Sequence, residues 1–208
     1  CNFPHSYAGS MTRNDLCGGY SISVYDVQVY YIDRMVAVSA KLSQITGSHM
    51  SSESLTPCYE KSTNGASSST MHSRCDGKGA YVAIIKLTNG REIAAYSPVD
   101  MGKSGYQNTN KAVLLSLTTG KHAVSTKYPQ YATYQSSSYG PTYGGGHDLH
   151  VNSAMSSGYC NFPYSYKGSM TRNDLCGGYS IGVSDVQVYY IAKIAAAAAK
   201  LSQITGDP

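Results

Sequence analysis

The sequence predicts a mainly β domain that ends in a helix. Charged residues make up only 13% of the chain, whereas tyrosine and glycine occur 20 and 21 times. This composition is typical of a β-rich, turn-rich protein with a polar but uncharged surface. In addition, short apolar runs alternate with Gly-rich turns between residues 80 and 191, and an alanine-rich stretch of helical character follows them.

The first strands form a predicted hairpin. Residues 81–87 are an apolar β run, Asn89-Gly90 is a strong turn signal, and residues 92–96 form the return strand. Farther along, "KAVLLSLTTGK" predicts a strand that ends in a Gly turn. "QYATYQ" alternates as a short strand does, and "YGPTYGGGHDLHV" is a Gly/Pro loop that leads into another strand.

The end of the chain changes from strand to helix. Residues 185–191 ("DVQVYYI") form a predicted strand with Val186, Val188 and Tyr190 on one face. In the following "AKIAAAAAKLSQIT", apolar residues recur at helical spacing, and alanine is the best helix former. This stripe consists of Ile194, Ala197, Leu201 and Ile204.

The two ends of the chain carry the same segment. Cys1–Gly47 aligns without a gap onto Cys160–Gly206, and 37 of the 47 positions are identical. We therefore divide the chain into a front copy (1–47), a linker (48–52) and a main domain (53–208). The linker region reads "GSHMSS", and "GSHM" is a familiar expression-vector scar, although a slice of a natural tandem array would look similar.

The front copy and the rear copy would occupy the same position in the fold. We expect it to present an apolar strand face and an apolar helix stripe without a packing site if the rear copy fills the domain. These candidate interaction residues are Val27, Val29 and Tyr31 on the strand, and Met35, Val38, Leu42 and Ile45 on the helix. Two outcomes are open: the front copy displaces the rear copy, or segments are exchanged between chains. We favour exchange, and expect oligomers that form with the front copy and vanish without it.

Charge and cysteine content bound the function. The net charge of +4 is scattered, which argues against nucleic acid, and no apolar run approaches the roughly 20 residues that span a bilayer. Six cysteines reduce to four independent positions. We expect disulfides, with Cys160–Cys176 and Cys1–Cys17 as segment-internal pairs, or links from each to the region of Cys58 and Cys75; buried reduced thiols are the alternative. Disulfides would favour an extracellular over a cytoplasmic location.

Four blocks, in order, resemble the signature of TLDc domains, which occur in the oxidation-resistance proteins. They are "STNGASSSTMHSRCDGKGAYVAIIKL", "AVLLSLTTG", "QYATYQSSSYGPTYGGGHDLHV" and "GGYSIGVSDVQVYYI". The resemblance covers residues 55–191 and implies a two-sheet antiparallel β-sandwich flanked by short helices. It also implies, for some members, binding to the vacuolar proton pump.

The chain departs from the family pattern in three ways. It shows no helical lead-in before Cys58, which places the start of the domain near Leu55. It has no Trp after the second strand, where "PVDMGKSGY" stands instead. It carries Gln187 where the family usually has Glu, although the acidic Asp185 is kept.

The "GGGHDLH" stretch is the first candidate site. His147 and Asp148 are candidate metal ligands, but His147 and His150 are three apart and would point to opposite faces of a strand. We therefore expect a structural role, in which Gly144–Gly146 permit a bend and the polar side chains satisfy backbone groups.

"HSRCD" is the second candidate, because His72 and Cys75 could form a nucleophile pair. No orienting group can be named for them, and no carboxylate pair stands in a glycosidase-like motif, so we expect neither an enzyme nor a cofactor. The leading hypothesis is an interaction module that self-assembles through its duplicated segment. The alternatives are an oxidation-resistance-type regulator and a secreted carbohydrate-binding module that uses the abundant tyrosines.

Overall fold

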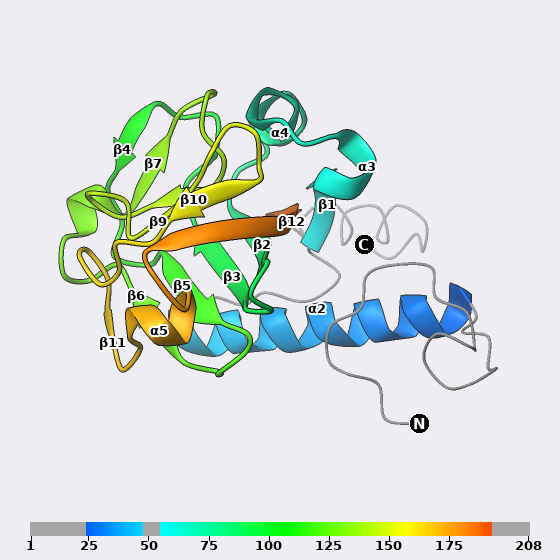
Figure 1. The fold of residues 1–208 in the computed structure, drawn as a ribbon, viewed down its shortest axis with the longest axis horizontal. Coiled ribbons are helices and arrows are strands. Elements are labelled where there is room, and N and C mark those ends of the chain that lie inside the picture. The colour runs from blue at the N-terminus through cyan, green and yellow to red at the C-terminus, as the bar shows by residue number, and fades with distance from the viewer. Residues whose placement is uncertain (1–23, 48–54, 193–208) are drawn as a thin grey trace, which may run out of the picture.

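A computed structural model describes residues 24–47 and 55–192 of the chain. Figure 1 shows α2 lying along one side of strands β2, β3 and β5, with β4, β7, β9 and β10 on the far side of these strands. The helices are α2 (Val24–Thr46), α3 (Lys61–Asn64), α4 (Ser68–Cys75), the 3-10 helix η2 (Pro129–Tyr131) and α5 (Arg172–Leu175). The strands are β1 (Leu55–Glu60), β2 (Tyr81–Leu87), β3 (Glu92–Ser97), β4 (Gly105–Gln107), β5 (Val113–Ser116), β6 (His122–Val124), β7 (Thr133–Gln135), β8 (Thr142–Tyr143), β9 (Leu149–Val151), β10 (Ser157–Tyr159), β11 (Lys167–Gly168) and β12 (Ser180–Ile191).

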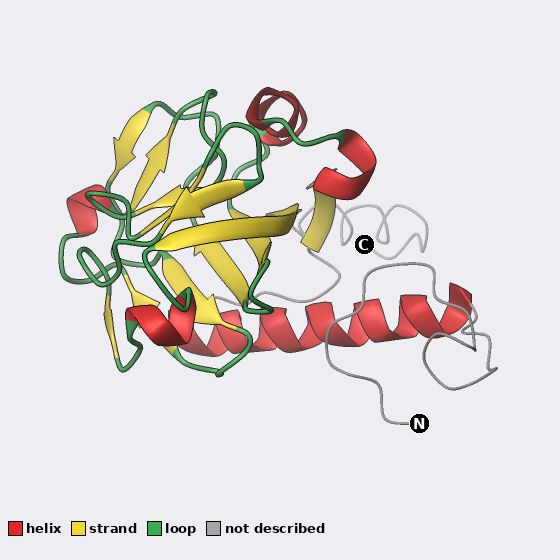
Figure 2. Ribbon diagram, in the orientation of Figure 1, coloured by secondary structure: helices red, strands yellow, loops and turns green. Residues whose placement is uncertain are grey.

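The strands are antiparallel and follow the order β11-β6-β5-β3-β2-β12-β10-β9-β8-β7-β4, with β1 also paired to β12. Strand β12 joins the two halves. Its first residues pair with β10, and the rest of the strand pairs with β2 on one edge and β1 on the other. A register shift between Val183 and Asp185 marks the change. Bulges of this kind bend a strand and increase its twist, which lets β12 serve both halves of the sandwich (Figure 2).

Strands β2 and β3 are buried on both faces, and successive residues enter different cores. Ile85 and Ile93 belong to the core between the two halves of the sandwich. Their neighbours Ile84 and Ala94 belong to a second core, which is closed by α2. Because side chains alternate along a strand, the uninterrupted apolar runs in the sequence reflect a strand with a packed layer on each side.

The observed elements confirm a mainly antiparallel β fold with flanking helices. The hairpin of β2 and β3 turns at Gly90, which has a φ of 83°. "QYATYQ" forms a strand only in its second half, β7, because Pro129–Tyr131 begin as the helix η2. The predicted strand at 185–191 lies within β12.

The predicted strand of the front copy is wrong. Residues 26–32, which include Val27, Val29 and Tyr31, belong to α2. Their counterparts in β12 are already paired on both edges, with β1 and β2. The front copy therefore finds no free edge beside that strand, and a helix satisfies its backbone groups internally.

Candidate functional site

The helix of the front copy packs on the outer face of β2, β3, β5 and the end of β12. We call this surface the helix-binding face. It consists of Val82, Ile84, Ala94, Tyr96, Val113, Leu115 and Tyr189. Each of these side chains is buried against α2 or against its neighbours in the same cluster.

Helix α2 presents its apolar stripe to this face. Met35 and Val38 are buried, Leu42 is fully buried, and Ile45 packs at the edge of the cluster. Val36, in contrast, is 43% exposed, which identifies the outward side of the helix. We expected this stripe to lack a packing site if the rear copy filled the domain. In the structure, the front copy supplies the helix and the rear copy supplies the strand of one domain.

An ion pair at the start of the stripe fixes the position of the helix. The Arg34 guanidinium lies 2.7 Å from Glu92 Oε2, and both side chains are largely buried. Sequence reasoning missed this pair. One feature of the sequence could have indicated it: Lys193, the counterpart of Arg34 in the rear copy, retains the positive charge.

The "GGGHDLH" stretch forms a turn followed by a short strand. His147 has a φ of 59° and precedes β9, so the argument that it and His150 point to opposite faces of a strand is wrong. Their rings stack at a centroid distance of 5.2 Å. In the described residues, no group of three His, Cys, Asp or Glu side chains has the arrangement of a metal site.

Asp148 lies at the centre of this turn and is fully buried. Its carboxylate accepts hydrogen bonds from the backbone N–H groups of Tyr164 and Ser165, the latter at 2.8 Å. Burial raises the pKa of Asp148 to about 6, and the two N–H donors oppose this rise. The residue thus ties the glycine turn to the loop that follows Phe162.

Glycine is favoured in this turn by two physical causes, which are backbone conformation and close packing. Gly144 and Gly146 have φ values of 87° and 66°, which residues with a Cβ rarely adopt. Gly145 instead lies against Tyr131, where an added Cβ would approach the tyrosine side chain at 3.0–3.1 Å.

Tyrosine and histidine rings form a continuous band over β4, β7, β9 and β10. Tyr106 and Tyr179, at its two ends, are 43% and 52% exposed. Burial, together with the neighbouring His147, lowers the pKa of His150 to about 4, so the centre of the band is uncharged at neutral pH. The members are Tyr106, Tyr131, Tyr134, Tyr139, His147, His150, Tyr159 and Tyr179.

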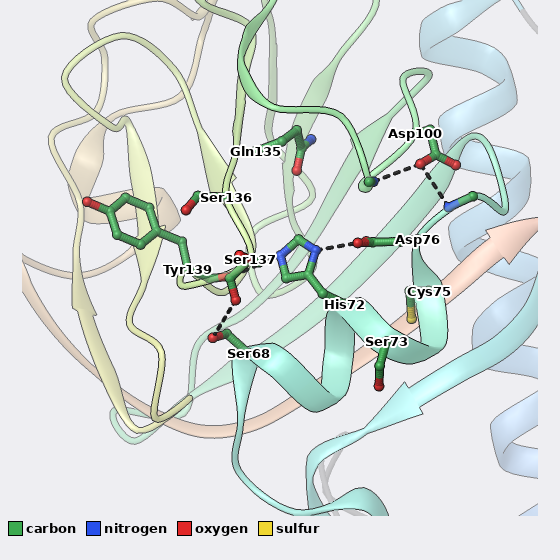
Figure 3. Close-up of polar contacts among 12 residues, drawn as sticks. Ser68, His72, Ser73, Cys75, Asp76, Asp100, Gln135, Ser136, Ser137 and Tyr139 are labelled. Carbon is green, nitrogen blue, oxygen red and sulfur yellow. Dashed lines mark hydrogen bonds and ion pairs between the residues drawn. The ribbon is translucent and has the colours of Figure 1, made fainter.

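The "HSRCD" block anchors α4 to the sandwich. Figure 3 shows the His72 ring between Asp76 and the segment that contains Tyr139. Nδ1 lies 2.7 Å from Asp76 Oδ1, and Nε2 lies 3.2 Å from the Tyr139 carbonyl oxygen. Both ring nitrogens are engaged, and the Cys75 sulfur is bonded to Cys58. The hypothetical His–Cys nucleophile pair is therefore not formed.

Two disulfides close the described part of the chain. Cys58 is bonded to Cys75, and Cys160 to Cys176. The second confirms the predicted segment-internal pair in the rear copy. Its counterpart, Cys1–Cys17, lies outside the described residues.

The fold and its sites define a disulfide-bonded β-sandwich domain that binds a helix across one sheet. A family model for the TLDc domain matches residues 37–192, and the chain belongs to this family. Membership indicates a protein-interaction module. Among curated proteins the chain has no match. No helix in the described part of the chain has the length and apolarity needed to cross a bilayer.

The start of the family match bears on where the domain begins. The match begins at residue 37, inside α2, so the expectation that the chain lacks a helical lead-in before Cys58 is wrong. The lead-in helix is present, and it is the helix of the front copy.

Proposed function

We propose that this chain is a non-catalytic interaction module that assembles with copies of itself by exchanging the helix of its duplicated segment. The supporting observation is that α2 of the front copy covers the helix-binding face, while the rear copy carries a second sequence for the same place. The buried positions Met35, Val38, Leu42 and Ile45 correspond to Ile194, Ala197, Leu201 and Ile204. The rear positions lie outside the described residues.

The helix is the part of the segment that is exchanged. The rear strand, within β12, is paired along its length with β2 and along parts of its other edge with β1 and β10. Its release would break these ladders, whereas release of α2 breaks one packed surface and the ion pair of Arg34. Lys193 provides the rear helix with a cation for Glu92, so both copies carry the same recognition elements.

Geometry favours exchange between molecules. The N–H group of Ile191, near the end of β12, donates to the carbonyl oxygen of Ala80. Ala80 precedes Lys86 by six residues, and Lys86 is the partner of Glu92 in the β2–β3 ladder. That separation is about 20 Å at roughly 3.3 Å per residue. Lys193 follows Ile191 by two residues, which span at most about 7 Å. The rear helix therefore takes the place of α2 on its own sheet only if the end of β12 unpairs or the helix shifts along the face.

The linker that joins α2 to the sheet controls this assembly. Helix and sheet are joined by residues 48–54, and short linkers give effective concentrations in the millimolar range. The stripe of α2 is also larger than the alanine-containing rear stripe. We therefore expect the intact chain to be mostly closed and monomeric, with oligomers forming when α2 leaves the face. This reverses the sequence-based expectation that assembly depends on the front copy.

Leu42 and Leu201 are identical residues at equivalent positions and provide a matched test in the full chain. Leu42→Asp places a charge in a fully buried position and should release α2. Light scattering should then show concentration-dependent oligomers. Leu201→Asp alone should remain monomeric, and the double variant should lose the oligomers of Leu42→Asp.

Two results would contradict the proposal. One is a folded, monomeric Leu42→Asp variant at all concentrations. The other is a double variant that associates as strongly as Leu42→Asp, because association would then come from the uncovered face rather than from the rear helix. Circular dichroism of each variant serves as the control for folding.

The setting of this module is also a proposal. Disulfides persist in oxidising compartments and are rare in the cytosol, so the two disulfides support an extracellular location. They give less support to the alternative of an oxidation-resistance-type regulator that binds the vacuolar proton pump. Carbohydrate binding by a secreted module remains compatible with them.

A further inference from the structure

A pocket of about 580 Å³ lies where the β2–β3 turn meets β12 and the end of β1. We call it the Asp185 pocket. Polar side chains dominate its lining, among them Glu60, Lys86, Thr88, Glu92, Ser184 and Asp185. Its size falls within the range of small-molecule sites. It is separate from the helix-binding face, although Glu92 takes part in both.

Two residues that line this pocket each have a buried carboxylate oxygen without a hydrogen-bond partner among the described residues: Glu92 Oε1 and Asp185 Oδ1. Glu92 exposes only 9% of its surface. Its other oxygen is held by Arg34, and Lys86 Nζ is 4.0 Å from Oε1, beyond hydrogen-bond distance. Buried acceptors are rarely left unpaired in proteins, so these two oxygens indicate a missing donor.

The surrounding polar groups are satisfied and hold these oxygens in place. The Gln187 amide donates to Glu60 Oε1 and to Asp185 Oδ2, both at 3.2 Å. Thr63 donates to the second oxygen of Glu60 at 2.9 Å. The Tyr189 hydroxyl donates to Gln187 Oε1 at 3.0 Å. The two free acceptors are therefore preorganised, which lowers the cost of binding a ligand.

Gln187 has a clear role here. A glutamate at this position would place a third carboxylate beside Glu60 and Asp185. The amide instead supplies the proton that each of them accepts. Burial already raises the pKa of Asp185, and Glu60 adds to this rise.

The charges in and around the Asp185 pocket nearly balance. Three carboxylates (Glu60, Glu92 and Asp185) and two cations (Lys86 and Arg91) line it, and Arg34 and Lys61 lie near Glu92 and Asp185. Neither a cation nor an anion is favoured by the net charge, and the described residues provide no metal-binding group of three. A suitable ligand donates two hydrogen bonds to the free oxygens and accepts others from Lys86 and from the hydroxyls of Thr88 and Ser184.

We propose that the Asp185 pocket binds a small neutral polyhydroxy ligand, such as a single sugar residue. Sugar hydroxyls both donate and accept hydrogen bonds, which matches two free acceptors beside an ammonium group and two hydroxyls. This site shares Glu92 with the helix exchange proposed above, because Arg34 of α2 pairs with Glu92 Oε2, so sugar binding is measured on the closed, monomeric chain.

The test uses ligand-detected NMR on the full chain, with the methyl glycosides of glucose, galactose, mannose and N-acetylglucosamine as probes. Asp185→Asn should weaken binding at least tenfold. Because Gln187 donates to Oδ2, the new amide turns its oxygen toward Gln187 and its NH₂ group into the pocket, so the free acceptor becomes a donor. Glu60→Gln removes the same charge from the same pocket, but both Glu60 oxygens are already paired, so binding should change less than about threefold.

Three outcomes would overturn the proposal. An equal loss in both variants, or binding of spermidine in place of sugars, would show that charge rather than the free acceptors governs the pocket. Absence of saturable binding by every glycoside would show that solvent alone satisfies these oxygens. If Asp185→Asn does not fold, Ser62→Phe fills the pocket from its exposed rim and should abolish binding while the carboxylates remain intact.

Discussion

At the scale of single residues, the glycine turn and Asp148 depend on each other. The backbone of Gly144 lies so close to the Asp148 carboxyl group that a Cβ on Gly144 would occupy the same space. The carboxyl group in turn accepts the N–H groups of Tyr164 and Ser165. The glycines of "GGGHD" therefore make room for the buried Asp148 carboxyl group and for the backbone that it binds.

Gly144→Ala should destabilise the domain by about 2–3 kcal/mol, because it combines a positive φ with a steric clash in a buried site. Gly145→Ala should cost less, about 1 kcal/mol, because Gly145 does not have a positive φ and Tyr131 is exposed enough to move. Urea denaturation of the two variants measures the difference. Equal losses would mean that the clash with Asp148 is relieved by a movement of the turn.

The pKa of Asp148 makes stability depend on pH. Burial raises this pKa from 3.8 to about 6, so the folded protein binds the proton more tightly than the unfolded chain does. The stabilising contribution is therefore fully present below pH 4 and is lost as the pH rises through 6. It amounts to about 2–3 kcal/mol.

Asp148→Asn is neutral at every pH and isolates this effect. Between pH 4 and pH 7, the free energy of unfolding of the variant should rise relative to that of the wild type by about that amount. Denaturation at both pH values provides the measurement. A constant difference would show that the N–H donors of Tyr164 and Ser165 hold the pKa of Asp148 at its ordinary value.

At the scale of elements, one sequence takes two structures. Residues 26–32 are helical in α2, whereas the identical residues 185–191 form strand in β12. The β-branched valines favour a strand, but only where a neighbouring strand offers hydrogen bonds. The rear copy is adjacent to β2 and β1, and the front copy is not, so pairing partners rather than local propensity decide the outcome.

At the scale of the whole molecule, both disulfide bonds and packed side chains stabilise the domain. The Cys160–Cys176 disulfide closes a loop of about 15 residues, which corresponds to about 3 kcal/mol in the chain-entropy estimate. It links the residue after β10 to the residue after α5. The disulfide therefore stabilises the rear segment by a covalent link rather than by packing.

Replacing Cys160 and Cys176 together by serine should lower the free energy of unfolding by about 3 kcal/mol. The same replacement of Cys1 and Cys17 is the matched control, because these residues precede the region matched to the family, and it should leave the domain unchanged. Thermal denaturation without reductant compares the two. Similar losses in both variants would show that the front segment is part of the domain's stable core.

The sequence by itself determined the class of fold, the β2–β3 hairpin and the rear strand, and it favoured the Cys160–Cys176 pair. Each of these follows from local signals: an apolar run, an Asn-Gly turn, or two cysteines within one segment. It also showed that the helix stripe at Met35 and Leu42 must be covered.

Only the tertiary structure decided what covers that stripe, which copy supplies which element, and where the Asp185 pocket lies. The stretches 26–32 and 185–191 are identical and have the same propensities, so the choice between them depends on which strand edge and which sheet face remain free. The pocket likewise joins β1, the β2–β3 turn and β12, which are far apart in the chain. Contacts between distant residues depend on the packing of the folded chain, and no local pattern encodes them.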